Sequence, residues 1–168
     1  MADSIRYKTY KNVLETLKCL GDKHKQIKTT TTGDIFDIDL NDANLFPLYH
    51  INPISAEINL QQKIFNFQIF VMDIVDADNN NEDYVQSDTF QIVSDLIALL
   101  KQGEILYHYD ASAGEEPRYF IEDDFTCEPF QERFDNFVTG WTVDIGVIVE
   151  SELNSCIIPI DNSATCIK

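Results

Sequence analysis

The chain has 168 residues, an apolar content of 44% and a formal net charge of −17. This length is typical of one domain and is enough to bury a hydrophobic core. The apolar content excludes a disordered chain, and no run approaches the ~20 apolar residues that a membrane helix needs. The first fifteen residues carry charges throughout and no apolar core, so we expect no secretory signal.

The charge is unevenly distributed along the chain. Residues 1–28 hold seven basic and three acidic side chains, so the remainder carries −21. An acidic body repels nucleic-acid phosphates over most of its surface, which argues against adhesive nucleic-acid binding. The basic segment is typical of a solvated helix with lysines on its wet face. Alternatively, it is complementary to the acidic body of another copy of the chain.

The four cysteines give no sign of a metal or redox site. Cys19, Cys127, Cys156 and Cys166 form no C-x-x-C pair, and no histidine lies close to them in sequence. This spacing argues against a zinc site or a redox motif. Without a secretory signal, we expect free thiols in a reducing compartment.

Residues 4–20 are predicted to form a helix. Ser4 is a plausible N-cap, and Gly21 is expected to end the helix. One apolar stripe recurs at helical spacing, made by Ile5, Val13, Leu14, Leu17 and Leu20.

Extended structure is predicted after this helix. Residues 26–32 are rich in threonine and favour a strand, and residues 33–46 indicate a loop with an extended piece. Residues 47–60 contain Pro47 and Pro53, so we expect the first half of this segment to be an edge or bulged strand. The second half alternates with period two, through Ile54, Ala56, Ile58 and Leu60.

The clearest strand is "IFNFQIFVMDIVD", residues 64–76. Phe65, Phe67, Ile69 and Val71 are expected on one face of it, and Asn66 and Gln68 on the other. A short turn separates this strand from the preceding one, which predicts an antiparallel hairpin. The first nine residues carry no charge, proline or glycine. They must therefore lie in the middle of a sheet, or be covered by another element or another subunit.

A second helix is predicted over residues 84–102, with a wide apolar stripe and Gly103 at its end. Asp83 and Gln86 resemble a capping box. Beyond it, we expect short strands near 104–109 and 118–121. Residues 130–137 favour a helical turn and a bent strand equally, and residues 141–150 alternate as a half-buried strand.

The order of elements predicts an α+β fold, with a mainly antiparallel sheet packed against two helices. Residues 1–150 are expected to form one domain, followed by an extension or arm at 151–168. That extension contains one apolar patch, "CIIPI", and it is either disordered or lies on a neighbouring subunit.

The stretch "DIVDADNNNED" resembles the start of a calcium loop, because Asp76, Asp78 and Asn80 alternate as oxygen ligands do. An EF-hand also needs glycine at loop position 6 and glutamate at position 12. Those positions hold Asn81 and Ser87, and a strand precedes the loop where the motif has a helix. We therefore interpret the stretch as a turn and helix cap.

No catalytic motif is evident. His24, His50 and His108 are scattered, and none lies beside a serine or cysteine in a nucleophile elbow. His50, in an apolar strand, is more typical of a satisfied core or interface residue. The sequence contains no phosphate-binding glycine loop and no H-E-x-x-H motif. We therefore expect no enzyme and assign no catalytic, cofactor-binding or metal-ligating residue.

The order of elements resembles that of the tail-terminator and tail-completion proteins of tailed bacteriophages. The resemblance is carried by "FPLYHINPISAEI", "IFNFQIFVMDIVD", the helix at 84–102 and "GWTVDIGVIVE". The stretch "GDIFDIDLNDANLFPLYHI" followed by "FNFQIFVMDIVD" is also similar to short virion proteins of crAss-like phages of gut Bacteroidota. Together these stretches cover about residues 1–150.

The resemblance implies a virion structural protein that is assembled in the host cytoplasm. Such proteins form closed homo-oligomeric rings, of six or twelve copies, at the neck or along the tail, flanked by other neck and tail proteins. DNA passes through the central channel without specific binding. An acidic channel wall would let DNA slide, and Glu122, Asp123 and Asp124 are candidates for it. Tail terminator, connector ring and tail-hub subunit all remain open.

Two other functions fit the same residues. One is a phage-encoded acidic binding module that occupies the basic groove of a host protein in the cytoplasm. The other is a small enzyme whose site is assembled only in space. Formation of a ring separates both from a tail protein.

Overall fold

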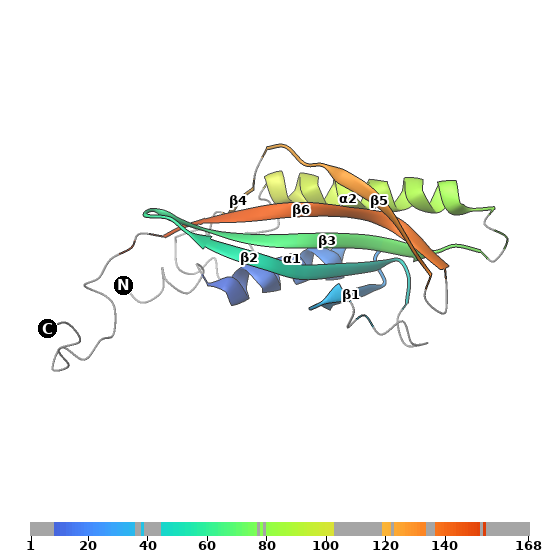
Figure 1. Ribbon diagram of the computed structural model, residues 1–168, viewed down its shortest axis with the longest axis horizontal. Coiled ribbons are helices and arrows are strands. Elements are labelled where there is room, and N and C mark those ends of the chain that lie inside the picture. The colour runs from blue at the N-terminus through green and yellow to red at the C-terminus, as the bar shows by residue number, and fades with distance from the viewer. Residues whose placement is uncertain are drawn as a thin grey trace, which may run out of the picture.

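The computed structural model describes residues 9–35, 38, 45–76, 78, 80–102, 119–121, 123–133, 137–151 and 153. Within these residues the chain has an α+β fold, in which two helices and a six-stranded sheet are layered (Figure 1). The elements in chain order are α1 (Tyr10–Lys23), β1 (Thr29–Thr32), β2 (Leu48–Ile58), β3 (Gln62–Ile74), α2 (Glu82–Gln102), β4 (Tyr119–Ile121), β5 (Cys127–Arg133) and β6 (Phe137–Glu150).

The sheet is mixed but mostly antiparallel. Its strands follow the order β1-β2-β3-β6-β4, and β5 also pairs with β6. β1 and β2 are parallel, whereas the other pairs are antiparallel. β3 pairs with β6 along its whole length on one side and with β2 from Lys63 to Met72 on the other. The prediction that this apolar strand lies in the middle of the sheet is therefore confirmed.

The main core lies between both helices and one face of the sheet. Alternation along β3 directs Phe65, Phe67, Ile69 and Val71 to this face, as predicted. The odd-numbered residues of β6 from Val143 to Val149 lie beside them. The helices contribute Val13, Leu17, Leu20, Ile92, Val93, Leu96 and Leu100. We call this the covered face.

Helix α1 differs from its prediction at both ends. It starts at Tyr10, where the Thr9 side chain accepts a hydrogen bond from the Asn12 amide, and it runs through Gly21 to Lys23. Gly21 does not end the helix. Its lack of a side chain instead allows α1 to pack closely on Tyr49. A Cβ atom there would lie 2.3 Å from Cδ1 of Tyr49. Ser4 and Ile5 lie outside the described residues.

Strand β2 contains the expected bulge, between Pro53 and Ser55. Of the two alternatives expected for its first half, an edge or a bulged strand, the structure shows the bulge, and residues 48–51 pair with β1 as well as β3. From Asn52 onward, β2 pairs only with β3 among the described residues. The alternating apolar residues of this second half lie at the surface: Ile54, Ile58 and Leu60 are 53%, 65% and 80% exposed.

A smaller apolar cluster lies on the opposite face of the sheet. It joins Leu48, Phe70, Met72 and Val138 to Ile38. His50 points to the same face, since it lies two residues from Leu48 on one strand. This second cluster fixes the end of the sheet where β3 leads into α2.

Helix α2 begins at Glu82, close to the predicted start. Asp83 therefore lies inside the helix, and the predicted capping box does not form. The Gln86 amide instead donates to Glu82 Oε1 (3.5 Å) and to Thr139 Oγ1 (3.3 Å). Phe90 packs edge-on against Trp141 of β6, with ring centroids 4.9 Å apart. No helix in the described part of the chain is long and apolar enough to cross a membrane.

The C-terminal third is described in part. β4 matches the predicted strand near 118–121, and β5 resolves the ambiguous segment in favour of strand. β5 and β6 form an antiparallel pair from Cys127 and Val143 to Arg133 and Phe137. The strand predicted near 104–109, most of the loop at 33–46 and most of the extension at 151–168 lie outside the described residues.

Candidate functional site

A groove of about 400 Å³ lies beside the C-terminal end of α1. Its apolar floor consists of Leu20 and Leu99, one from each helix, and its rim carries Lys23 and Lys25. His24 and Gln26 complete the lining. The helix α1 ends at Lys23, and the backbone of its C-cap residue His24 is extended.

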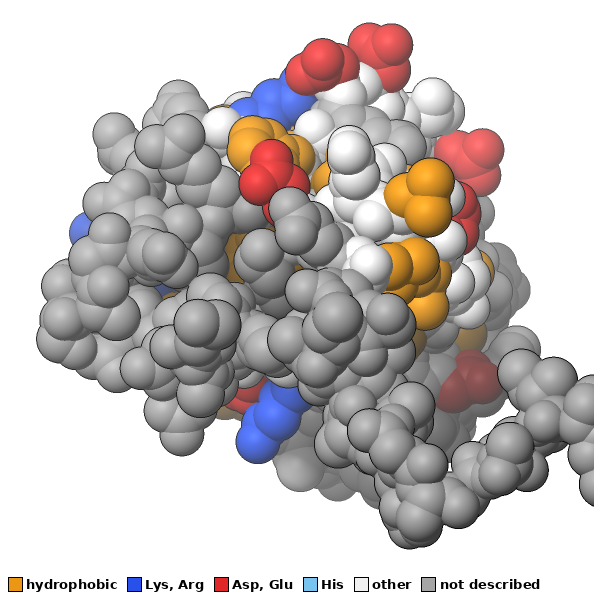
Figure 2. Space-filling model, turned by 90° about the vertical axis from the view of Figure 1, so that its left-hand side faces the viewer, with side chains coloured by type: hydrophobic (Ala, Val, Ile, Leu, Met, Phe, Trp, Pro, Cys, Tyr) orange, Lys and Arg blue, Asp and Glu red, His pale blue; other side chains and the backbone are white. Residues whose placement is uncertain are grey.

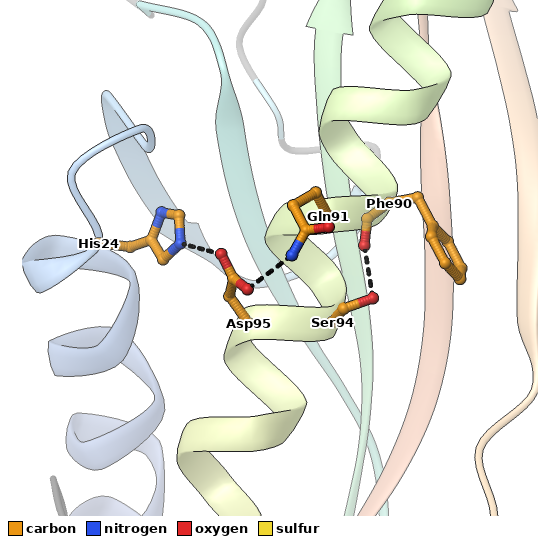
Figure 3. A network of polar contacts seen from close by, with 5 residues as sticks. All are labelled: His24, Phe90, Gln91, Ser94 and Asp95. Atoms are coloured by element: carbon orange, nitrogen blue, oxygen red, sulfur yellow. Dashed lines mark hydrogen bonds and ion pairs between the residues drawn. The ribbon is translucent and has the colours of Figure 1, made fainter.

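A polar network ties the two helices together at this groove (Figure 3). His24 Nε2 lies 3.4 Å from Asp95 Oδ2, and the Gln91 amide donates to Asp95 Oδ1 at 2.9 Å. The Ser94 hydroxyl donates to the Phe90 carbonyl at 3.0 Å. The network therefore fixes the histidine against α2.

Among the described residues, this network orients a histidine but brings no hydroxyl or thiol against its ring. His24 Nδ1 is buried and has no hydrogen-bond partner within the part of the chain that the structure describes. A Ser–His or Cys–His mechanism needs a hydroxyl or thiol within hydrogen-bonding distance of the histidine. The described contacts attach α1 to α2 beside a groove with a basic rim.

His50 lies in the second apolar cluster, at 1% exposure. The Gly33 carbonyl can only accept, so Nε2, 3.1 Å away, carries the proton. In the neutral ring Nδ1 then accepts from the Thr31 hydroxyl at 2.8 Å. The prediction of a satisfied core histidine is confirmed. His108 lies outside the described residues.

The proposed turn at residues 76–81 is confirmed as a connection between β3 and α2. The Asn81 side chain accepts from the Asp76 amide at 2.9 Å, and the Asn81 carbonyl accepts from the Val85 amide. Within the described ranges, no three His, Cys, Asp or Glu side chains are grouped so as to hold a metal ion. Asp76 and Asp78 belong to the turn.

Two of the cysteines are described, and both Cys19 and Cys127 are free thiols. Burial raises the pKa of the Cys127 thiol. A raised pKa keeps this thiol protonated and a poor nucleophile at neutral pH. Cys156 and Cys166 lie outside the described residues.

The end of the molecule formed by the β2–β3 turn carries an exposed apolar surface, which we call the hairpin end. It comprises Ile54, Ile58, Leu60 and Leu153, each more than half exposed. The chain after β6 passes along the turn, since the amides of Ser151 and Leu153 donate to the carbonyls of Gln61 and Leu60. Figure 2 looks onto this end, where apolar side chains lie at the surface among polar ones.

The segment that leads from the end of β3 into α2 is acidic. Six carboxylates lie between residues 73 and 88, and no Lys or Arg occurs between Lys63 and Lys101. Burial raises the pKa of Asp73, and the nearby charge of Asp88 raises it further. Tyr84, in the first turn of α2, is 75% exposed among these acids.

Of the acids that the resemblance places on a channel wall, Asp123 and Asp124 are described and both are exposed. The Lys101 ammonium contacts the backbone oxygen of Asp123 at 2.8 Å and lies 5.2 Å from the centre of the Phe125 ring. These contacts attach the segment after β4 to the end of α2.

Comparison with known protein families and curated proteins identifies no relative of the chain. No protein family model matches the chain, and no curated protein is significantly similar to it.

Proposed function

We propose that the chain is a structural subunit of a homo-oligomeric ring in the neck or tail of a tailed bacteriophage virion. The observation that carries the proposal is the exposed apolar surface of the hairpin end. A projecting hairpin with three large apolar side chains more than half exposed is typical of a surface that is buried on assembly.

The free edge of β2 supports the same function. Beyond Ile51 this strand has a neighbour on one side only, among the described residues. Natural sheets protect such edges with charge, proline or a covering element. Here Pro53 and the bulge protect part of the edge, and a neighbouring subunit would cover the rest.

The family resemblance is what suggests a virion protein. The negative charge of the chain fits that suggestion. DNA carries a dense negative charge, so an acidic channel wall repels it and lets it pass. Asp123 and Asp124 are exposed, as a channel wall requires. A ring reconstruction with these two side chains far from the channel would remove this part of the proposal.

The test of virion membership is quantitative mass spectrometry of particles purified by density gradient from a lysate of the infected host. The proposal predicts the chain in DNA-filled particles at a fixed six or twelve copies per particle. Its presence only in the particle-free fraction would contradict the proposal.

The acidic segment favours a second function, that of a cytoplasmic module that occupies the basic groove of a host protein. Carboxylates concentrated around an exposed tyrosine are suited to such a groove. This module would remain a monomer or dimer, and its binding would weaken steeply with salt. Assembly into a ring at physiological salt distinguishes the two functions.

A further inference from the structure

The second half of β2 has an outer edge that can take another strand. Residues 53–58 are all exposed, whichever face of the sheet their side chains lie on. From Asn52 onward the strand pairs only with β3 among the described residues. The edge of a strand presents amide and carbonyl groups with which another strand can pair. We call residues 54–58 the open edge.

Hydrogen bonds near the open edge show which of its backbone groups point outward. The Asn59 amide donates to the Gln62 carbonyl across the turn, so the backbone groups of Asn59 face β3. In an antiparallel ladder these groups face alternate sides from one residue to the next. Ala56 and Ile58 therefore present their amide and carbonyl groups to the outer side. Pro53 limits the open edge, because proline has no amide hydrogen to donate.

The chain after β6 leads toward this edge. The Ser151 amide donates to the Gln61 carbonyl at 2.8 Å, and the Leu153 amide donates to the Leu60 carbonyl at 3.3 Å. These two contacts pass from the β3 side of the turn to its β2 side. Neighbouring strands lie about 4.8 Å apart and an extended residue spans about 3.3 Å, so about two or three further residues reach the outer side of β2. Residues 154–168 follow and supply that length.

The sequence of this tail suits the open edge. Residues 156–160, "CIIPI", are apolar and carry no charge. In an edge strand, Pro159 can lie only where its missing amide hydrogen would face outward. By alternation, the backbone groups of Cys156 and Ile158 then face the opposite side, toward β2. Cys156 is the first residue of this set that lies far enough beyond Leu153 to reach the edge.

We propose that residues 156–160 form a further strand on the open edge of their own chain, antiparallel to β2. Cys156 would pair with Ile58, and Ile158 would pair with Ala56, since the two strands run in opposite directions. Paired side chains lie on the same face, so the tail would cover part of the exposed isoleucine of β2. The proline of the tail would face outward and protect the new edge from further pairing.

This pairing takes place within one copy of the chain and does not depend on the proposed ring. In a ring, a neighbouring subunit would cover the edge of β2 through the added strand. Leu60 and Leu153, which are 80% and 58% exposed, lie at the turn and not along the side of β2. They therefore stay available to a neighbouring subunit.

Cross-linking to the native Cys156 tests the register. In the full chain with Cys166→Ser, Ile58→Cys should form a disulfide with Cys156 in oxidised glutathione, because Cα atoms of paired residues lie about 5.5 Å apart. Glu57→Cys is the matched control, since the Glu57 side chain lies on the other face, where it accepts from the Asn66 amide. This control should react roughly tenfold more slowly or less. Peptide mass spectrometry identifies the linked cysteines, and non-reducing electrophoresis separates links within one copy from links between copies.

Hydrogen exchange followed by NMR tests the backbone pairing. The amides of Ala56 and Ile58 should be protected in the wild-type chain. Ile158→Pro removes an amide that faces β2, and it should speed exchange at both positions roughly tenfold or more. Ile157→Pro, one residue earlier, removes an amide that faces outward and should leave their exchange unchanged.

The outcomes separate the added strand from the function. Preferred linkage at position 58 within one copy, with faster exchange only in Ile158→Pro, is the expected result. Equal linkage at positions 57 and 58, links that join two copies, or unprotected edge amides in the wild-type chain would overturn the proposal. A chain that shows the expected linkage but stays monomeric would overturn the ring alone.

Discussion

Replacing Gly21 with alanine tests how closely α1 packs on the sheet. The new Cβ would lie 2.3 Å from Cδ1 of Tyr49 and 2.6 Å from Oγ1 of Thr30. Carbon atoms in contact normally stand about 3.5–4.0 Å apart, and Tyr49 is only 1% exposed, so its ring has no space to retreat. Overpacking of this kind costs about 1–3 kcal/mol, and we take the upper end.

The higher helix propensity of alanine offsets part of this loss of stability. Alanine in a helix interior is normally about 1 kcal/mol more favourable than glycine. The net expectation for Gly21→Ala is a loss of about 2 kcal/mol in the free energy of unfolding. For a chain of this size, that loss lowers Tm by roughly 4–8 °C.

The assay is thermal and urea unfolding followed by circular dichroism. Asp22→Ala, at the exposed neighbouring position, is the control and should change stability by less than about 0.5 kcal/mol. Combining Gly21→Ala with Tyr49→Leu should cost less than the sum of the two single changes, because the smaller side chain makes room. A gain of about 1 kcal/mol from Gly21→Ala alone would refute the close contact.

Three further changes probe other parts of the fold. Gly140→Ala places a Cβ 1.9 Å from a backbone oxygen of β3, in the central strand pair, and should cost about 4 kcal/mol in urea unfolding; near-neutral stability would contradict the register. Thr31→Val removes the donor to buried His50 Nδ1 and should cost about 1–3 kcal/mol, whereas Thr31→Ser should not. Asp73→Asn should raise Tm at pH 7, because burial raises the folded pKa of this carboxyl, so that its ionised form opposes folding. The protonated form of Asp73 stabilises the fold fully below the pKa of about 4 that the carboxyl has in the unfolded chain, and this stability is lost as the pH rises through the higher pKa of the folded protein. The difference in Tm between the asparagine variant and the wild type should therefore vanish near pH 3. An advantage that persists there would contradict the assignment.

The elements that the sequence predicts well are those whose signal is local. Alternation along residues 65–71 identifies a strand and its buried face, because side chains of a strand point to opposite faces wherever the strand lies. The predicted turn after β3 is confirmed for the same reason, since asparagine and aspartate favour turns through bonds to nearby backbone groups.

The predictions that failed depended on distant partners. Gly21 has the composition of a helix stop, but its role is set by the Tyr49 ring, which is far along the chain. The period-two alternation at Ile58 predicts a strand but not what covers its face, and Ile58 is 65% exposed. The basic-rimmed groove joins Leu20 to Leu99, and no spacing in the sequence relates these two residues.

The most direct test of the central claim is native mass spectrometry of the purified chain, with negative-stain imaging, at physiological salt. The account predicts a closed ring with a single copy number of six or twelve, unchanged by calcium. A monomer at every concentration, or an open polymer of indefinite length, would contradict it.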